Sequence, residues 1–369
     1  MIAEKIHWAL VAGRRLKIQG AGSWSNAGRP VASDETLSLA DHRGIVEYVA
    51  GDLTLTARSG TRLSDIASAT GAEGQWLPLD PWGGDDGSIG ATISTATAGP
   101  YAHAIGLPRD IVIGVEFVSG AGDTIRAGGR VVKNVAGFDL TRLVTGSWGS
   151  LGVITEVTVR LRGRPELSRT LAILVPPTRV GLNDLAVRLR SLPFLPLGSE
   201  MLNDQLASHL KLGAQPVLLV RLAGNERSVT AQLNAMRDLG DWADVSNELW
   251  DALRTADHAS TGSWRWSQLP SQFGDTWTAA DGAARALETF FLHGNPARGV
   301  VRVVAHPSEA DASRVVRAAT AFKGTVAVER LAADAWPLVS PITPDPLSRA
   351  IRDKFDPSRI LNSGIMGAE

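Results

Sequence analysis

Apolar and polar residues alternate along short segments of the first 165 residues, and a period of two is typical of β-strands with one buried face. The longest such segment is VITEVTVRL at residues 153–161, which follows closely spaced glycines at 137, 146, 149 and 152. The same alternation predicts shorter strands at residues 16–19, 36–39, 44–49, 53–57, 110–118 and 124–126. Helical spacing of apolar residues predicts helices at 3–12 and 61–69, the second capped by Ser59 or Thr61.

The pattern changes after residues 162–166, where glycines become sparse and strand-like segments alternate with longer helical ones. We predict strands at 170–175, 199–202, 216–222, 263–269, 299–305 and 325–330, and helices at 182–192, 226–239, 247–256 and 308–322. Helices packed on one antiparallel sheet account for this order. The predicted domains are 1–165, with a small lobe of about 1–75 and a larger lobe of about 76–165, and an α+β cap at 166–340. Residues 341–369 form a tail that begins with a helix at 346–354.

Composition and charge narrow the function classes. The 369 residues contain 44% hydrophobic and 20% charged residues, which is typical of a globular protein with two domains. The formal net charge of -1 gives no bulk electrostatic case for a nucleic acid or an anionic membrane as partner. Cysteine is absent, which excludes disulfides, thiolate catalysis and cysteine-ligated iron–sulfur or zinc centres in this chain. We find no signal peptide and no uncharged run of the roughly 20 residues that a membrane span needs, so we expect a cytoplasmic protein.

Two loops have the composition of ligand-binding loops. Residues 20–25 follow the first predicted strand with small side chains, and consecutive backbone N–H groups there can form a concavity for an anion. Their spacing does not fit the Rossmann fingerprint, because position 25 is serine and no helical run follows. Residues 74–100 form a second stretch rich in glycine and proline, and long loops of this kind are usually functional or mobile.

The glycines between 137 and 152 allow two interpretations. They can form a plain turn before the strand at 153–161, or they can clear space for a bulky flat group that approaches the backbone. Asp139 likewise can be the N-cap of a short helix at 140–144 or can hold the geometry of a cofactor loop.

Four stretches taken together resemble the FAD-binding fold of the vanillyl-alcohol-oxidase and FAD-linked-oxidase superfamily. They are the loop at 20–25, DPWGGDDGSIGATI at 80–93, KNVAGFDLTRLVTGSWGSLGVITEV at 133–157 and FDPSRILNSGIM at 355–366. The resemblance is strong over about 15–165, returns at 346–367 and is weak between 167 and 340. It implies an α+β chain with a two-lobed PCMH-type FAD-binding domain, an α+β cap on an antiparallel sheet, and a tail that returns to the FAD domain.

Within that superfamily the motifs are most similar to the FAD-binding subunits of glycolate oxidases. Such a subunit works with a larger catalytic flavoprotein subunit and an iron–sulfur subunit, and the complex oxidises glycolate to glyoxylate. The resemblance therefore implies FAD as cofactor, a small 2-hydroxy acid as substrate, and contact with the inner membrane only through the complex.

The resemblance also assigns roles to residues. The pyrophosphate would lie on Gly20, Ala21, Gly22, Ser23, Trp24 and Ser25, completed by Trp82, Gly83, Ser88, Ile89 and Gly90. Gly149, Gly152, Val153 and Ile154 would line the flavin and adenine side, and Asn134, Gly137 and Asp139 would hold the local geometry. These roles suit the chemistry of FAD. Its pyrophosphate needs backbone N–H donors, and its flat isoalloxazine ring needs a backbone that can approach it closely.

No catalytic residue or metal site can be assigned from the sequence. Related 2-hydroxy-acid dehydrogenases hold a metal through paired histidines and an acidic residue, whereas His209, His258, His293 and His306 are isolated in this cap. His103 is a candidate for covalent flavin attachment or base chemistry, or a plain loop residue, and Arg109 and Asp110 form a family-like pair or a structural ion pair. Five of the eleven tryptophans fall within 242–277, where they can line a pocket or anchor a core.

Three functions follow from these observations. The first is an FAD-binding subunit of a glycolate-oxidising complex, with the chemistry placed on its partner. The second is an FAD-dependent oxidoreductase that acts alone on another small hydroxy substrate. The third is a scaffold subunit without catalysis, against which the retained small residues at 20–22 argue.

Overall fold

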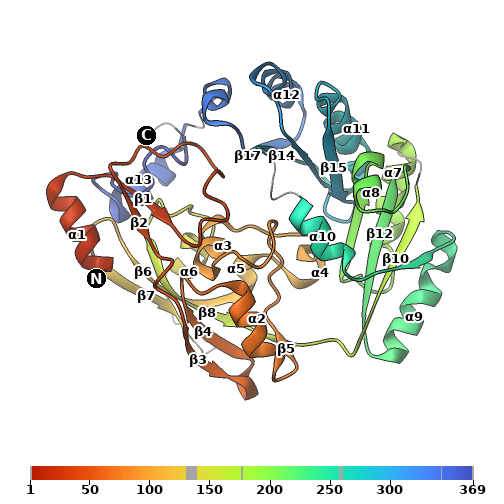
Figure 1. The fold of residues 1–369 in the computed structure, drawn as a ribbon, viewed down its shortest axis with the longest axis horizontal. Helices are drawn as coiled ribbons and strands as arrows, with labels where there is room; N and C mark the ends of the chain where they lie inside the picture. Colours follow the sequence, from red (N-terminus) through yellow and green to blue (C-terminus); the bar gives the residue numbers. More distant parts are fainter. Residues whose placement is uncertain (1, 130–138, 176–177, 257–260, 342, 368–369) are drawn as a thin grey trace.

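The computed structural model describes residues 2–129, 139–175, 178–256, 261–341 and 343–367 (Figure 1). The amino-terminal domain is built on a five-stranded antiparallel sheet. Its strands, in spatial order, are β3 (Ile45–Val49), β4 (Thr54–Arg58), β8 (Val153–Arg160), β6 (Val112–Val118) and β7 (Thr124–Gly128). β4 pairs directly with β8, so residue 75 does not mark a break between sheets.

Helices pack on this sheet through apolar residues at the spacing that the sequence shows. α2 (Leu63–Gly71), α3 (Ile89–Thr95) and α5 (Pro108–Ile111) bury Ile66, Ile93 and Ile111 against Phe117 and Val157. Burial of such side chains contributes about 1.5–3 kcal/mol each. The remaining short elements of this domain are the 3-10 helix Ala50–Asp52, α4 (Ala102–Ile105) and α6 (Leu140–Val144), and the strand pair β5 (Gln75–Trp76) and β9 (Arg162–Gly163).

A second, smaller sheet carries the first ligand-loop candidate. β1 (Leu16–Gln19) runs parallel to β2 (Glu35–Ser38), and Leu16 also forms a parallel bridge with Leu361 near the end of the chain. α1 (Ile2–Ala12) covers these strands through Ile6 and Ala9. The tail, after α13 (Pro346–Phe355), therefore completes the amino-terminal domain.

The cap is an eight-stranded sheet in which every pairing is antiparallel. The spatial order is β13 (Ala243–Val245), β10 (Leu167–Leu174), β12 (Val217–Gly224), β11 (Gly198–Leu202), β15 (Phe290–Asn295), β16 (Val300–Ala305), β14 (Gly262–Ser267) and β17 (Thr325–Arg330). One face is covered by α7 (Arg179–Arg190), α9 (Glu226–Met236), α11 (Phe273–Ala284) and α12 (Glu309–Ala321). α8 (Asp204–His209) and α10 (Leu249–Ala256) contribute to a separate apolar cluster that includes Trp82 and Tyr101 of the first domain. Three 3-10 helices complete the cap region at Arg237–Leu239, Pro270–Gln272 and Ala333–Leu338.

The two faces of the cap sheet differ because strand side chains alternate. On β14, Trp264 and Trp266 are buried in the core with the covering helices, whereas Arg265 lines a cavity on the opposite side. On β16, Val301 belongs to that core while Arg302 lines the same cavity. The sheet thus presents a charged face to the amino-terminal domain.

The structure confirms most predicted elements and corrects several. The sequence did not predict α3, α4, α5, α8, α11, β5, β9, β13 or β15, and the strand predicted at 110–118 begins only at Val112, because α5 occupies the residues before it. Neither Ser59 nor Thr61 caps α2, whose N-cap is Arg62 without a side-chain cap bond, because Thr61 Oγ1 instead donates to the Arg58 carbonyl oxygen at 2.7 Å. Of the clustered tryptophans, Trp250, Trp264, Trp266 and Trp277 are core residues, and Trp242 is half-buried.

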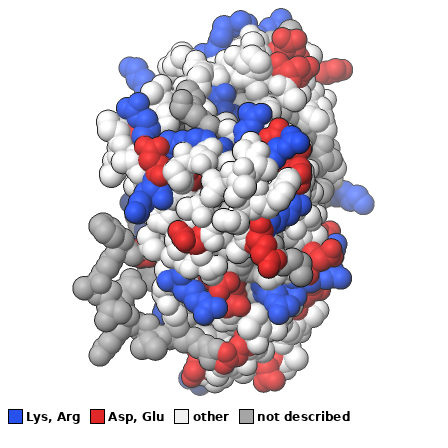
Figure 2. Space-filling view, turned by 90° about the vertical axis from the view of Figure 1, so that its left-hand side faces the viewer, with Lys and Arg blue, Asp and Glu red and all other residues white. Residues whose placement is uncertain are grey.

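The exposed face in Figure 2 carries Lys and Arg interspersed with Asp and Glu. This mixture agrees with the nearly neutral formal charge. Among the described helices, none combines the length and apolarity required to cross a bilayer.

Candidate functional site

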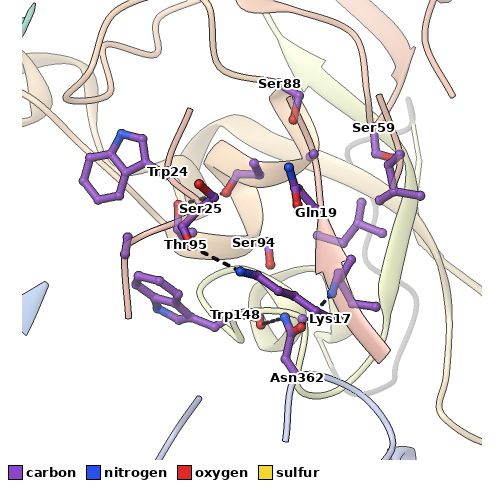
Figure 3. Close-up of a pocket in the computed structure, with 18 of the residues that line it drawn as sticks. Lys17, Gln19, Trp24, Ser25, Ser59, Ser88, Ser94, Thr95, Trp148 and Asn362 are labelled. Atoms are coloured by element: carbon purple, nitrogen blue, oxygen red, sulfur yellow. Dashed lines mark hydrogen bonds between the residues drawn. The ribbon is translucent and has the colours of Figure 1, made fainter. Parts of the chain in front are cut away.

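A cleft opens at the carboxyl end of β1, where residues 20–25 leave the sheet. It has a volume of about 120 Å³ and lies between this loop, the start of α3, the turn at 148–152 and the tail at 362–365. Figure 3 shows that Lys17 extends across it, with its ammonium group 3.5 Å from the Ser25 carbonyl oxygen. Asn362 fixes the tail beside the cleft, because its Nδ2 donates to the Trp148 carbonyl oxygen at 2.7 Å and its Oδ1 accepts from Ile18 N–H at 2.8 Å.

Ten of the residues predicted from the sequence line this one cleft. They are Gly20, Gly22, Ser23, Trp24, Ser25, Ser88, Gly90, Gly149, Gly152 and Ile154. Three segments that are separated by about 60 residues each in the chain therefore meet, and they do so through backbone and small side chains.

The other predicted residues lie elsewhere. Trp82 lines a different cavity, and the Gly83 N–H donates to the Arg254 carbonyl oxygen at 2.9 Å. Ile89 and Val153 are core residues, and Ala21 faces Ser88 Oγ through its N–H at 3.4 Å. Asn134 and Gly137 lie outside the described residues.

Asp139 is the N-cap of α6. Its Oδ1 accepts a hydrogen bond from the Arg142 N–H at 3.0 Å, which satisfies one of the free donors of the first turn. It does not line the cleft. The structure thus supports the capping interpretation of this residue.

Further cleft residues were not predicted. They are Lys17, Gln19, Ser59, Ser94, Thr95, Trp148 and Asn362. Trp148 has φ +56, a left-handed conformation that is costly for a large side chain, and sits between Gly146 and Gly149. The glycine-rich sequence around it was the available signal that the backbone here is unusual.

A larger cavity of about 630 Å³ lies between the first domain and the charged face of the cap sheet. It shares Trp24, Thr95, Trp148 and Ile365 with the cleft, so the two spaces adjoin. Four arginines and two glutamates line it, namely Arg29, Arg265, Arg298, Arg302, Glu200 and Glu329. This excess of positive charge favours an anionic ligand.

The charged groups of the large cavity are not equally available. Glu329 accepts from Arg265 Nε at 3.0 Å and also binds Arg302, so a single carboxylate is shared by both arginines and offsets part of their charge. Arg29 donates to the carbonyl oxygens of Val339 and Ser340. Arg298, by contrast, forms neither a hydrogen bond nor an ion pair through its guanidinium within the part of the chain that the structure describes. Arg298 is therefore the cation best placed to receive a ligand anion.

A buried acid–base pair lies at the same cavity. His293 Nδ1 is 2.7 Å from Glu200 Oε1, and the two side chains are only 2% and 3% exposed. Burial raises the pKa of Glu200 and lowers the pKa of His293. His293 also contacts Trp82, with ring centroids 4.6 Å apart. Sequence reasoning treated His293 as isolated, because its partner is distant in the chain.

A buried arginine joins the cap to the loop at 80–101 of the amino-terminal domain. Arg254 of α10 donates through Nε to the Pro81 carbonyl oxygen at 3.1 Å and pairs with Asp85. Nearby, Asp80 accepts from the N–H groups of Gly99 and Tyr101, and burial raises its pKa to about 6. The loop at 80–101 is thereby fixed between the two cavities.

The remaining candidates do not enter the site. His103 lines neither cavity, and burial lowers its pKa. Asp110 accepts from the Leu107 N–H at 2.9 Å, which caps α5. In the described ranges, no three His, Asp or Glu side chains are grouped closely enough to hold a metal.

The sequence of this chain is similar to that of known FAD-binding proteins. A family model described as an FAD binding domain matches residues 1–128. The chain is 35% identical over 256 residues to the glycolate oxidase subunit GlcE of Escherichia coli, which is 69% of this chain and 67% of that protein. It is 41% identical over 130 residues to the glycolate oxidase subunit GlcD of Bacillus subtilis, but that alignment covers only 28% of the relative.

Solved structures show the same fold at low sequence identity. A 4-ethylphenol oxidase from Gulosibacter chungangensis matches with a TM-score of 0.76 and 14% identity, over 99% of this chain and 87% of that one. An alkyldihydroxyacetonephosphate synthase matches with a TM-score of 0.70 and 14% identity, over 98% of this chain and 75% of that one. These likenesses extend through both domains, which fits a PCMH-type FAD-binding domain with an α+β cap.

The cleft residues fit the demands of FAD. A Cβ at Gly20 would collide with Ser88 Oγ, and a Cβ at Gly90 would lie 2.5 Å from Ser59 Cβ, so the backbone there leaves no room to spare. Ser59 Oγ is buried and has no hydrogen-bond partner among the described residues. Because the cleft alone is smaller than a dinucleotide, FAD would need the adjoining cavity as well.

Proposed function

The chain belongs to the superfamily of FAD-linked oxidoreductases, and from that premise we propose that it is the FAD-binding subunit of a glycolate-oxidising complex. Its cofactor is FAD. The observation that carries the proposal is the alignment with the Escherichia coli glycolate oxidase subunit over 256 residues, which extends well beyond the FAD-binding domain. The partners would be a catalytic flavoprotein subunit and an iron–sulfur subunit, and any contact with a membrane would be made through them.

Bound flavin would accept a hydride, which carries two electrons, from the substrate. The chain's own residues would do the rest. Residues 20–25 and the start of α3 would hold the pyrophosphate through backbone N–H groups, with the Lys17 ammonium group nearby as a counter-charge. Trp24 and Trp148, which line both spaces, would enclose the flat ring system and exclude water.

The large cavity would receive the substrate. Glycolate is a small carboxylate, and Arg298 offers a guanidinium without a hydrogen-bond or ion-pair partner among the described residues. A charge-assisted hydrogen bond to a carboxylate is stronger than a neutral one, and it would orient the acid in the cavity.

The proposal is tested by assembling the complex. We expect a tagged chain, co-expressed with the two partner subunits, to retain them on purification and to support glycolate-dependent reduction of an artificial electron acceptor with glyoxylate as product. The chain alone should show a flavin spectrum and little bleaching by glycolate. Failure of the three subunits to co-purify, together with no glyoxylate formation, would overturn the proposal.

A second function has support from the large cavity. Its charged lining lies on this chain, which would suit an FAD-dependent oxidoreductase acting alone on another small hydroxy acid. A panel of hydroxy acids added without oxygen to the purified chain separates the two functions. Rapid bleaching of the flavin by one of them, without partner subunits, would favour the second.

A further inference from the structure

The Glu200–His293 pair has a feature that a structural ion pair does not need. Glu200 uses only Oε1 for His293, and its Oε2 is buried without a hydrogen-bond partner among the described residues while the side chain lines the large cavity. A buried oxygen of a carboxylate is costly to leave unpaired. A ligand donor that reaches Glu200 from the cavity would satisfy this oxygen.

Strand pairing explains how the pair is held. β11 and β15 are neighbours in the cap sheet, and Leu202 lies opposite His293 in the register. Because alternate residues share a face, Glu200 and His293 both point away from the covering helices. The Trp82 ring of the first domain packs on His293. The Arg302 guanidinium lies over the same Trp82 ring, 5.0 Å from the ring centroid.

The groups around the pair set its charge state. Burial opposes the ionised carboxylate of Glu200 most strongly, while the hydrogen bond from His293 and the nearby Arg298 and Arg302 favour it, so that the pKa of Glu200 is raised. For His293, burial and Arg302 oppose the imidazolium, and Glu200 and Glu329 favour it. With neutral His293 donating its Nδ1–H to Oε1, Glu200 carries the negative charge and its Oε2 can accept one proton.

We propose that Glu200 is the proton acceptor for the oxidation of a small hydroxy acid in this cavity, and that His293 is a positioning residue that fixes the Glu200 carboxylate. The inference rests on the proposed function and adds a catalytic group on this chain. The hydroxyl O–H bond breaks, its proton goes to Glu200 Oε2, and its electron pair forms the carbonyl bond of a 2-oxo acid. Bound FAD would supply the oxidant for the second half of this reaction, accepting the hydrogen of the hydroxyl-bearing carbon with its electron pair.

Binding of a carboxylate that cannot react tests this role without turnover. The probe is oxalate, added to the full FAD-loaded chain between pH 5.5 and 8.5 and followed by perturbation of the flavin absorbance. An anion at Arg298 lies near the Glu200 carboxylate, so binding favours protonated Glu200 and should weaken as pH rises, by up to tenfold per pH unit. We expect the oxalate affinity of Glu200→Gln to depend less on pH than that of the wild type, with the remaining dependence set by Asp80, whose pKa is about 6 and which also interacts with Arg298.

Catalysis gives the second measurement. A positioned general base contributes typically about 10²–10⁴-fold, so Glu200→Gln should slow glycolate-dependent flavin reduction in the assembled complex, the form in which the chain is proposed to work, by at least about 100-fold. His293→Gln should slow it less and shift the pH at which the rate rises, an effect that a purely structural role would not produce. Glu226→Gln, an exposed carboxylate of the same cap, is the matched control and should change neither measurement.

The outcomes separate this inference from the proposed function. If the assembled complex oxidises glycolate and Glu200→Gln retains the rate and the pH dependence, the role of Glu200 is wrong and the proposed function stands. If the complex does not oxidise glycolate but Glu200→Gln reduces the pH dependence of oxalate binding, the proposed function fails and the proton-coupled site remains. Absence of oxalate binding to the wild-type chain at every pH would overturn the inference.

Discussion

The cleft and the large cavity adjoin each other but are lined by different means. Loops line the cleft with backbone and small side chains, and Lys17 is its one charged lining residue in the described part of the chain. Strands of the cap line the large cavity with arginines and glutamates on one face of the sheet. The exposed surface in Figure 2 shows no such concentration of one charge.

The difference has a physical origin. A large cofactor that stays in place is recognised by shape and by backbone donors, which need close approach. A small anion has little area to bury, so a few strong charged contacts must supply its affinity. We expect substitutions in the two spaces to separate loss of cofactor from loss of small-anion binding.

The largest effect should follow Gly20→Val. Its Cβ would collide with Ser88 Oγ and lie 3.2 Å from Ala91 Cβ, so the loop at 20–25 would have to shift against α3, and FAD affinity should fall by about 100-fold or more. The flavin-to-protein ratio of the purified variant measures this loss, and circular dichroism verifies the fold. A matched change at Gly282, where a Cβ meets nothing within 4 Å, should leave the ratio unchanged. Full flavin content in Gly20→Val would show that the cleft does not hold FAD.

Arg298→Met tests the other space. It keeps the length of the side chain but removes the charge, and loss of a charge-assisted contact of about 1.5–3 kcal/mol should weaken oxalate binding by about 10–100-fold. Flavin content should stay at the wild-type level. Loss of flavin in this variant, or unchanged oxalate affinity, would contradict the division between the two spaces.

Asp80 should make stability depend on pH. Its pKa is about 6 in the folded state and 3.8 in the reference state, so the native protein binds the proton more tightly than the unfolded chain. The contribution of Asp80 to the free energy of unfolding is fully present below about pH 4. It is lost as the pH rises through about 6, and the total loss is about 2–3 kcal/mol. Urea unfolding of wild type and Asp80→Asn at pH 4.5, 5.5 and 6.5 measures the difference in slope.

A parallel series with Asp184→Asn, an exposed carboxylate on α7, provides the control for Asp80. Asp80 holds the loop at 97–101, part of which lines the large cavity. Equal pH slopes for wild type and Asp80→Asn would show that ionisation of Asp80 does not limit the stability of that loop.

The smallest effect should come from Asp139→Ala. Loss of the N-cap bond to Arg142 N–H should lower the free energy of unfolding by about 1 kcal/mol. Flavin content should not change, because Asp139 lies outside both spaces. A large loss of flavin with an unchanged midpoint of unfolding would instead give Asp139 a cofactor role.

The sequence predicted the residues of the cleft better than those of the large cavity, because the cleft residues lie close together within short motifs of the chain. Gly20, Ser88 and Gly149 belong to contiguous motifs, because a backbone-lined site needs several small residues in a row. Glu200 and His293 are 93 residues apart, and only the pairing of β11 with β15 joins them. Neither residue has neighbours in sequence that reveal a site.

The missed elements have similar causes. α11 contains two glycines, which lower helix propensity, yet Gly274 is required because a Cβ there would collide with the backbone of α7 at Arg179. β15 places His293 and Asn295 in an otherwise apolar segment, so its alternation is short and weak. Tertiary packing decides both elements, and it is not visible in a local pattern.

The tail has a consequence for the order of synthesis. Asn362 binds both Ile18 and Trp148, and Leu361 bridges Leu16, so residues translated long after β1, 344 positions further along the chain for Asn362 and Ile18, complete a site that begins with β1. During translation the amino-terminal segments must wait until residues 361–365 have left the ribosome before the cleft is closed. A flavin held in this cleft would then mark a chain whose translation has passed residue 365.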